Sequence, residues 1–119
     1  MPDRYLGIDV GAETVKVVEL TLERGKPAWT SRRRVEHHQQ PGRHLLRLLE
    51  ELDLPGVRGA AVTGRLGRLV DLPRIPVKQA QAAGHRFLHG PEAATLVSIG
   101  SHGFSVLEVR PEGTDQFRQ

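Results

Sequence analysis

Residues 9–16, DVGAETVK, combine a carboxylate, a glycine-containing turn and a lysine. A tight turn can aim several backbone N–H groups into one hollow, which suits an anion. Gly11 lets the main chain come close because it has no Cβ. Lys16 shares a strand face with Thr14, so its ammonium could contact a phosphate, and Asp9 could hold Mg²⁺ through water. An ordinary hairpin with an exposed lysine fits this short pattern equally well.

The surrounding pattern predicts the elements that would position these residues. Apolar and β-branched residues alternate with polar ones where strands are expected, and leucines recur at helical spacing where a helix is expected. The predicted strands are 4–10, 14–22, 27–37, 58–63, 70–72, 94–100 and 104–109, and the predicted helices are 43–52 and, opened by Pro76, 77–89. Apart from the short strand at 70–72, the order is β-β-β-α-β-α-β-β, which predicts an α/β, ribonuclease-H-like mixed sheet flanked by helices.

Composition sets the class of protein. The chain has 119 residues, 38% of them hydrophobic and 26% charged, which fits one globular domain by size. It has no cysteine, so it supplies no disulfide, thiolate or iron–sulfur ligand. No apolar stretch is long enough to cross a bilayer, and no signal-peptide pattern opens the chain. We therefore expect a cytoplasmic location and no membrane partner.

A basic run distinguishes the third predicted strand. Arg32, Arg33 and Arg34 precede His37 and His38, and the net charge is +3. A solvated strand face or loop is the usual setting for such a run. Nucleic acid is an unfavoured partner because aromatic residues make up only 4% of the chain, although weak attraction to phosphates stays open. The aromatic residues Trp29 and Phe87 are expected to be core or half-buried.

Histidine and serine residues offer two further kinds of site. His85 and His89 lie four apart on a predicted helix and could share a metal ion, but no third ligand is evident. Ser98, Ser101 and His102 are close in sequence, yet nothing supplies the orienting group that a nucleophilic serine needs. We expect neither a metal centre nor a nucleophile here.

The segment GIDVGAETVKVVEL, residues 7–20, resembles the first phosphate motif of the actin/sugar kinase/heat-shock ATPase superfamily. Within that superfamily, two branches have an opening motif similar to this segment. One is the pilus-assembly relatives of actin, and the other is the BadF/BadG/BcrA/BcrD-type activator ATPases of 2-hydroxyacyl-CoA dehydratases and benzoyl-CoA reductases. The remaining chain favours the activators. AAVTGRLGR (60–68) resembles their T-G-x-G-R segment, PVKQAQAAGHRFL (76–88) their following helix, and TLVSIGSHGFSVLEV (95–109) their second phosphate motif.

The resemblance implies a nucleotide site and a domain arrangement. Residues 1–93 would form an N-terminal actin-like ATPase lobe, and residues 94–119 would begin the next lobe with a second phosphate loop. The implied ligands are ATP and Mg²⁺, with Asp9 orienting the metal and no iron–sulfur cluster in this chain. Implied partners are the remaining lobe of a larger polypeptide and a dehydratase or reductase component, and a homodimer is a further expectation. The implied nucleotide-binding residues are Asp9, Gly11, Ala12, Glu13, Thr14, Lys16, Gly100, Ser101, His102 and Gly103.

Four residues depart from the pattern of the family. Ala12 replaces a serine and Glu13 a small neutral residue, and a carboxylate beside a triphosphate is repulsive. Ser98 and Gly103 replace the two aspartates of the second motif, which would hold magnesium or position water. We therefore do not expect this chain to hydrolyse ATP alone. A degenerate, non-catalytic interaction domain, as in pilus-assembly relatives of actin, is the alternative.

Overall fold

The computed structural model describes residues 3–100, 103–110 and 116–118, and its contacts divide the chain into two compact units. Unit 1 is Met1–Ile75 and unit 2 is Pro76–Gln119. The division falls before the second helix because that helix packs with the strands that follow it. A domain boundary at 93/94, where the next lobe of a longer chain would begin, stays a prediction.

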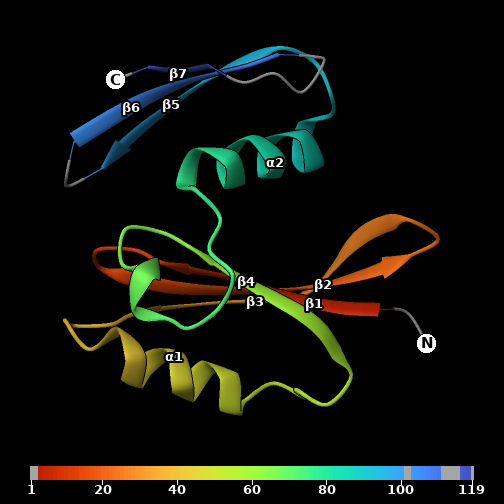
Figure 1. The fold of residues 1–119 in the computed structure, drawn as a ribbon, viewed down its shortest axis with the longest axis vertical. Helices are drawn as coiled ribbons and strands as arrows, with labels where there is room; N and C mark the ends of the chain where they lie inside the picture. The colour runs from red at the N-terminus through yellow and green to blue at the C-terminus, as the bar shows by residue number, and fades with distance from the viewer. Residues whose placement is uncertain (1–2, 101–102, 111–115, 119) are drawn as a thin grey trace. The chain divides into compact units, whose positions relative to one another are not determined.

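Unit 1 is a four-stranded mixed sheet with one helix on one face (Figure 1). The strand order is β3-β2-β1-β4, in which β1 pairs antiparallel with β2 and parallel with β4, and β2 pairs antiparallel with β3. Its elements are β1 (Asp3–Val10), β2 (Thr14–Glu23), β3 (Lys26–Glu36), α1 (Pro41–Glu50) and β4 (Val57–Thr63). These bounds agree with the predicted elements to within two residues.

The core of unit 1 lies between this sheet and α1. Alternate residues of β1 and β2 point to the helix, as the period of two requires, and α1 contributes leucines at helical spacing. The opposite face of the sheet therefore carries the other residues of β1 and β2, Asp9 and Lys16 among them. The buried core residues are Leu6, Ile8, Val10, Val15, Val17, Leu45, Leu48 and Val62.

Two features of unit 1 differ from the predictions, the start of α1 and the segment 70–72. α1 begins at Pro41, which was expected to precede the helix, because proline is well suited to the first helical position. The predicted strand at 70–72 is wrong: a short 3₁₀ helix, η1 (Gly67–Leu69), is followed by irregular chain. Instead, Arg74 forms an isolated parallel bridge with Val62, which adds one position of pairing beyond β4.

Unit 2 is a helix packed on a three-stranded antiparallel sheet of order β5-β6-β7. Its elements are α2 (Val77–His89), β5 (Ala94–Gly100), β6 (Gly103–Val109) and β7 (Gln116–Arg118), of which β7 was not predicted. Ala82 of α2 packs with the buried Leu107 and Val109 of β6. Among the described residues neither α1 nor α2 is long and apolar enough to cross a membrane.

Candidate phosphate-binding site

The β1–β2 turn, residues 11–14, has the geometry of a compact loop with free amides. The Gly11 N–H donates to the carbonyl oxygen of Thr14 at 2.9 Å and closes the turn. Among the described residues no hydrogen bond engages the N–H groups of Ala12 and Glu13. The Glu13 side chain is exposed. Two backbone donors of the turn are therefore available to an anion.

His37 supports this turn from the buried side of the sheet, although its run of basic residues was predicted to be a solvated strand face or loop. Its side chain is 1% exposed, and its Nε2 lies 2.9 Å from the carbonyl oxygen of Gly11. The Gln39 N–H donates to Nδ1 at 3.1 Å, so Nε2 carries the proton and donates to Gly11. The His37 N–H also donates to the Glu13 carbonyl at 3.0 Å. One buried histidine thus binds the turn at both Gly11 and Glu13.

The signal that identifies His37 is the alternation of the third strand. Ser31, Arg33 and Val35 are half-buried, whereas Arg32, Arg34 and Glu36 are exposed. Extending this period by two residues puts His37 on the α1 side of the sheet, and the solvated interpretation of that residue was therefore wrong.

A row of polar residues crosses the sheet on the face opposite α1. Asp9 is the direct partner of Lys16 on β2 and of Thr63 on β4. Lys16 is in turn the partner of Arg34 on β3. Among the described residues neither Asp9 nor Lys16 has an ion-pair partner. The pairing register thus places a carboxylate, an ammonium and a guanidinium side by side next to the turn.

The segment after β4 closes one side of this row. Gly64 has a φ of +99°, and a Cβ added to it would lie 2.5 Å from the Val10 carbonyl oxygen and even closer to Asp9 Oδ1. The Leu66 N–H donates to the Val10 carbonyl oxygen at 2.8 Å. Thr63 Oγ1 is buried and has no hydrogen-bond partner among the described residues. The 60–68 motif was part of the family resemblance, but Thr63 and Gly64 were not among the predicted site residues.

Asp9 and Thr63 fit a magnesium ion that is shared with a ligand. Both offer oxygen, the donor that Mg²⁺ prefers, and Mg²⁺ in phosphate sites is held by one or two carboxylates together with phosphates and water. No group of three or more His, Cys, Asp or Glu side chains that could hold a metal occurs in the described part of the chain. A site built from Asp9 therefore requires the phosphates as further ligands.

The second predicted loop lies in unit 2 and is only partly described. Gly100, the last residue of β5, pairs with Gly103, the first residue of β6, and Gly103 has a φ of +118°. Ser101 and His102 lie outside the described residues. Ser98 Oγ accepts a hydrogen bond from Gln81 Nε2 at 3.0 Å, which ties this residue to α2. Phosphate binding by residues 100–103 stays a prediction.

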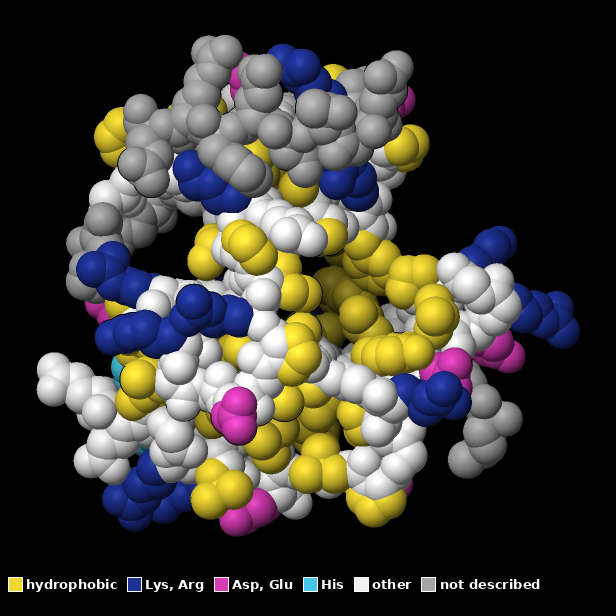
Figure 2. Space-filling model, in the orientation of Figure 1, with side chains coloured by type: hydrophobic (Ala, Val, Ile, Leu, Met, Phe, Trp, Pro, Cys, Tyr) yellow, Lys and Arg dark blue, Asp and Glu magenta, His cyan; other side chains and the backbone are white. Residues whose placement is uncertain are grey.

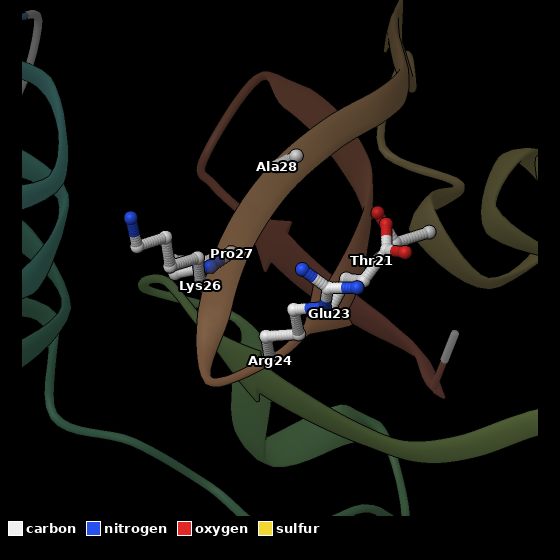
Figure 3. Close-up of a pocket in the computed structure, with 6 residues that line it drawn as sticks. All are labelled: Thr21, Glu23, Arg24, Lys26, Pro27 and Ala28. Atoms are coloured by element: carbon white, nitrogen blue, oxygen red, sulfur yellow. The ribbon is translucent and has the colours of Figure 1, made fainter.

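The other candidates from the sequence do not converge on a site. The rings of His85 and His89 lie 5.0 Å apart on α2 without a third ligand in the described chain. Trp29 and Phe87 are 45% and 41% exposed, so neither is a core residue. A hollow of about 420 Å³ at the β2–β3 turn is lined by Thr21, Glu23, Arg24, Lys26, Pro27 and Ala28 (Figure 3).

That hollow at the β2–β3 turn has mixed charge. In Figure 3 the Lys26 side chain points away from that of Arg24, and the acidic Glu23 directly precedes Arg24 in the sequence. Basic and acidic side chains both project at this end of the sheet on the face drawn in Figure 2. The polar groups do not converge there, and the hollow lies at the opposite end of β2 from the 11–14 turn.

Comparison with known proteins shows the fold of the chain. No model of a known protein family matches it, and no curated protein matches it in sequence. Among solved structures, it is similar to the activator of the 2-hydroxyisocaproyl-CoA dehydratase from Clostridium difficile with bound ADPNP. The TM-score is 0.73 at 22% identity, over 100% of this chain and 46% of that one.

Two further structures show how widely this fold is shared. Component A of the Acidaminococcus fermentans (R)-2-hydroxyglutaryl-CoA dehydratase gives a TM-score of 0.73 at 23% identity, over 98% of this chain and 47% of that one. The Ppx/GppA family member from Aquifex aeolicus gives 0.65 at 13% identity, over 100% and 50%.

The chain therefore has the actin-like, ribonuclease-H-like ATPase fold that the sequence predicted. Within that class, the expected likeness to the N-terminal portion of dehydratase activators is confirmed at the level of fold. The chain spans about half the length of these neighbours.

Proposed function

We propose that this chain is the nucleotide-phosphate-binding N-terminal lobe of an ATPase similar to the BadF/BadG/BcrA/BcrD-type activators of acyl-CoA dehydratases and reductases. The observation that carries the proposal is the Asp9–Lys16 pair beside the 11–14 turn, whose Ala12 and Glu13 amides are free. The similarity in fold between this chain and a protein whose structure holds ADPNP also supports the proposal.

Each residue of the site has a distinct role in this proposal. The free amides of the turn bind phosphate oxygens, and Lys16 adds a positive charge on the same side of the sheet. Asp9, with Thr63 beside it, holds Mg²⁺, which neutralises phosphate charge when it is bound. In the longer chain, residues Gly100, Ser101, His102 and Gly103 form the opposing loop. Glu13 weakens binding because its carboxylate repels a phosphate.

Binding rather than hydrolysis is the activity proposed for this chain by itself. The second motif has Ser98 and Gly103 where carboxylates are expected, so the groups that would hold magnesium or position water are missing from those positions. We propose that the remaining lobe belongs to a larger cytoplasmic polypeptide and that its partner is a dehydratase or reductase component.

Calorimetric titration with Mg-ATP tests the proposal. We expect measurable heat with the wild type and a Kd at least about tenfold weaker with Lys16→Ala, because one charge-assisted phosphate contact contributes about 1.5 kcal/mol or more. Lys26→Ala is the matched control, since it removes an exposed lysine at the far end of the same hairpin. Absence of heat with the wild type, or equal losses in both variants, would refute the proposal.

The alternative function is a degenerate, non-catalytic interaction domain like those of pilus-assembly relatives of actin. An exposed apolar face on the β5–β6 hairpin favours it, since Val97, Ile99 and Phe104 are 59%, 83% and 67% exposed. Gel filtration addresses this reading, because an uncovered apolar sheet face promotes association. A concentration-dependent dimer in a chain that gives no heat with Mg-ATP would favour the alternative.

A further inference from the structure

A basic groove runs along β2 and β3 on the face of the sheet opposite α1. It has a volume of about 380 Å³ and is lined by Lys16, Val18, Arg32, Arg33 and Arg34. The register places Lys16 opposite Arg34 and Val18 opposite Arg32, so one apolar side chain lies among three cations. We call this surface the β2–β3 groove.

The side chains of Lys16, Arg32 and Arg34 in the β2–β3 groove form no ion pair with an acidic side chain of the described chain. Lys16, Arg32 and Arg34 are exposed, and among the described residues none of them forms an ion pair. Arg33 points to the other face, where it donates to Glu51 Oε2 at 2.9 Å. On the α1 face of β3 an arginine therefore pairs with a carboxylate, whereas on the opposite face Arg32 and Arg34 form no ion pair within the described chain.

The backbone of β3 offers a second recognition element. β3 is the outermost strand of its sheet and extends over 11 residues. No strand in the described residues pairs with its outer edge, so the main chain presents unpaired donors and acceptors there. Arginines on an edge strand disfavour pairing with a second copy of this chain, since like charges would face each other.

We propose that the β2–β3 groove and the free edge of β3 bind an extended acidic segment of a partner protein as an added strand. Carboxylates at alternate positions of an extended chain are about 6.6–6.8 Å apart, as are Arg32 and Arg34 on β3. An added strand satisfies the edge backbone, and arginine pairs with carboxylates in a forked geometry. A phosphate chain would meet the charges but would leave the edge of β3 unpaired.

Trp29 provides a local reporter for this binding. It is the only tryptophan of the chain, and Arg32 Cζ lies 5.2 Å from the centre of its ring. An acidic ligand that draws Arg32 away from the ring changes the environment of the indole. Trp29 fluorescence can therefore follow titration with a ten-residue peptide of alternating Glu and Val, with its Lys-Val counterpart, and with linear polyphosphate of matched charge.

We expect saturable binding of the Glu-Val peptide and none of the Lys-Val peptide. The double variant Arg32→Glu/Arg34→Glu should weaken the Kd at least about tenfold, because two close charge pairs are lost and reversed. The double variant Arg43→Glu/Arg47→Glu, with the same change in net charge on α1, should change it less than about twofold. Urea unfolding of each variant verifies that it is folded, and Lys16 stays unchanged because it also belongs to the proposed nucleotide site.

Hydrogen exchange separates strand addition from attraction by charge alone. With the Glu-Val peptide bound, amides of residues 30–35 should exchange more slowly, and those of α1 should not change. Binding without this protection, binding of polyphosphate alone, or equal losses in both double variants would overturn the proposal. Mg-ATP binding is measured on the unaltered chain, so a failure of this proposal is distinguishable from a failure of the proposed nucleotide site.

Discussion

At the scale of single residues, His37 supports the 11–14 turn and Gly64 packs on the end of β1 that leads into it. His37 donates to the Gly11 carbonyl from the buried side of the sheet. Gly64 lies against Asp9 and the Val10 carbonyl from the other side, in a backbone conformation that other residues rarely adopt. Both residues therefore act on the shape of this region through contacts with its backbone and with Asp9. His37 and Gly64 can each be replaced singly, and each variant can be compared with a control variant at another position.

Replacement of His37 by Ala should lower the free energy of unfolding by about 2–3 kcal/mol. The variant loses a buried hydrogen bond, leaves the Gly11 carbonyl unsatisfied and opens a cavity. Urea unfolding followed by Trp29 fluorescence measures this. His38→Asn is the control, since His38 is exposed and asparagine tolerates its φ of 47°. A loss as large in the control would contradict the role given to His37.

Gly64→Ala should be more damaging than the same change at Gly25. Both glycines have positive φ, +99° and +76°, so each variant has backbone strain of about 1 kcal/mol. Only at Gly64 does the new Cβ also collide with Val10 and Asp9, which raises the expected cost to about 2 kcal/mol or more. Denaturation midpoints of the two variants provide the comparison. Equal midpoints would show that the loop does not pack on Asp9 as described.

At the scale of elements, strand register brings the site together and α1 supports it from the opposite face. Asp9, Lys16 and Thr63 come from three strands and meet because β1 is central and pairs with both β2 and β4. α1 buries Leu45 and Leu48 against those strands. Loss of α1 packing would release β2 and β3 together, so the conditions that weaken α1 also weaken the site.

Acidification should destabilise the protein in part through α1. Partial burial, followed by the charges of Arg47, His38 and Arg43, lowers the pKa of His44 below its ordinary value of 6.5. Below that pH the unfolded chain binds the proton more readily than the folded chain, so stability falls as the pH falls. Unfolding curves between pH 7 and pH 5 measure the decline, which should be smaller in His44→Gln. An identical decline in both proteins would contradict this account.

At the scale of the whole molecule, the two units differ in the size of their cores. Eight buried apolar side chains form the core of unit 1, whereas three form that of unit 2 among the described residues. The chain also spans about half the length of its structural neighbours. Unit 2 exposes Ile99 and Phe104 on the sheet face away from α2. A larger partner or lobe would cover that face in the proposed longer protein.

Native-state hydrogen exchange should reveal this difference between the units. Amides of Ile8, Val15 and Val17 in unit 1 are expected to exchange more slowly than those of Val106 and Leu107 in unit 2, by at least about tenfold in protection factor. A larger apolar core resists local opening better. Mass spectrometry of peptides from each unit measures the rates. Equal protection, or slower exchange in unit 2, would be inconsistent with the cores described.

The sequence predicted most of the architecture because periodicity is local. The strands of unit 1 and both helices were found to within two residues, since alternation and leucine spacing report which face is buried. The order of the elements and the family resemblance both predicted the fold class, and the structural neighbours confirm it. The strand expected at 70–72 was wrong because an apolar pair in a short loop packs without extended pairing.

The site was only half predictable, for a physical reason. Asp9, Gly11 and Lys16 lie within one hairpin, so their proximity follows from sequence spacing. The contributions of His37, Thr63 and Gly64 depend on which distant strand ends meet the turn, and that is decided by parallel pairing of β1 with β4 and by burial. Alternation along the third strand could have placed His37, but nothing local indicates the contact of Gly64 with Asp9.

The most direct test of the central claim is an amide chemical-shift titration of the ¹⁵N-labelled chain with Mg-ATP. We predict that the largest shifts occur at Gly11, Ala12, Glu13 and Thr14, and that Lys16→Ala suppresses them. The spectrum would contradict the claim if these amides stayed unchanged while the nucleotide shifted signals elsewhere, or if saturating Mg-ATP moved no signal at all.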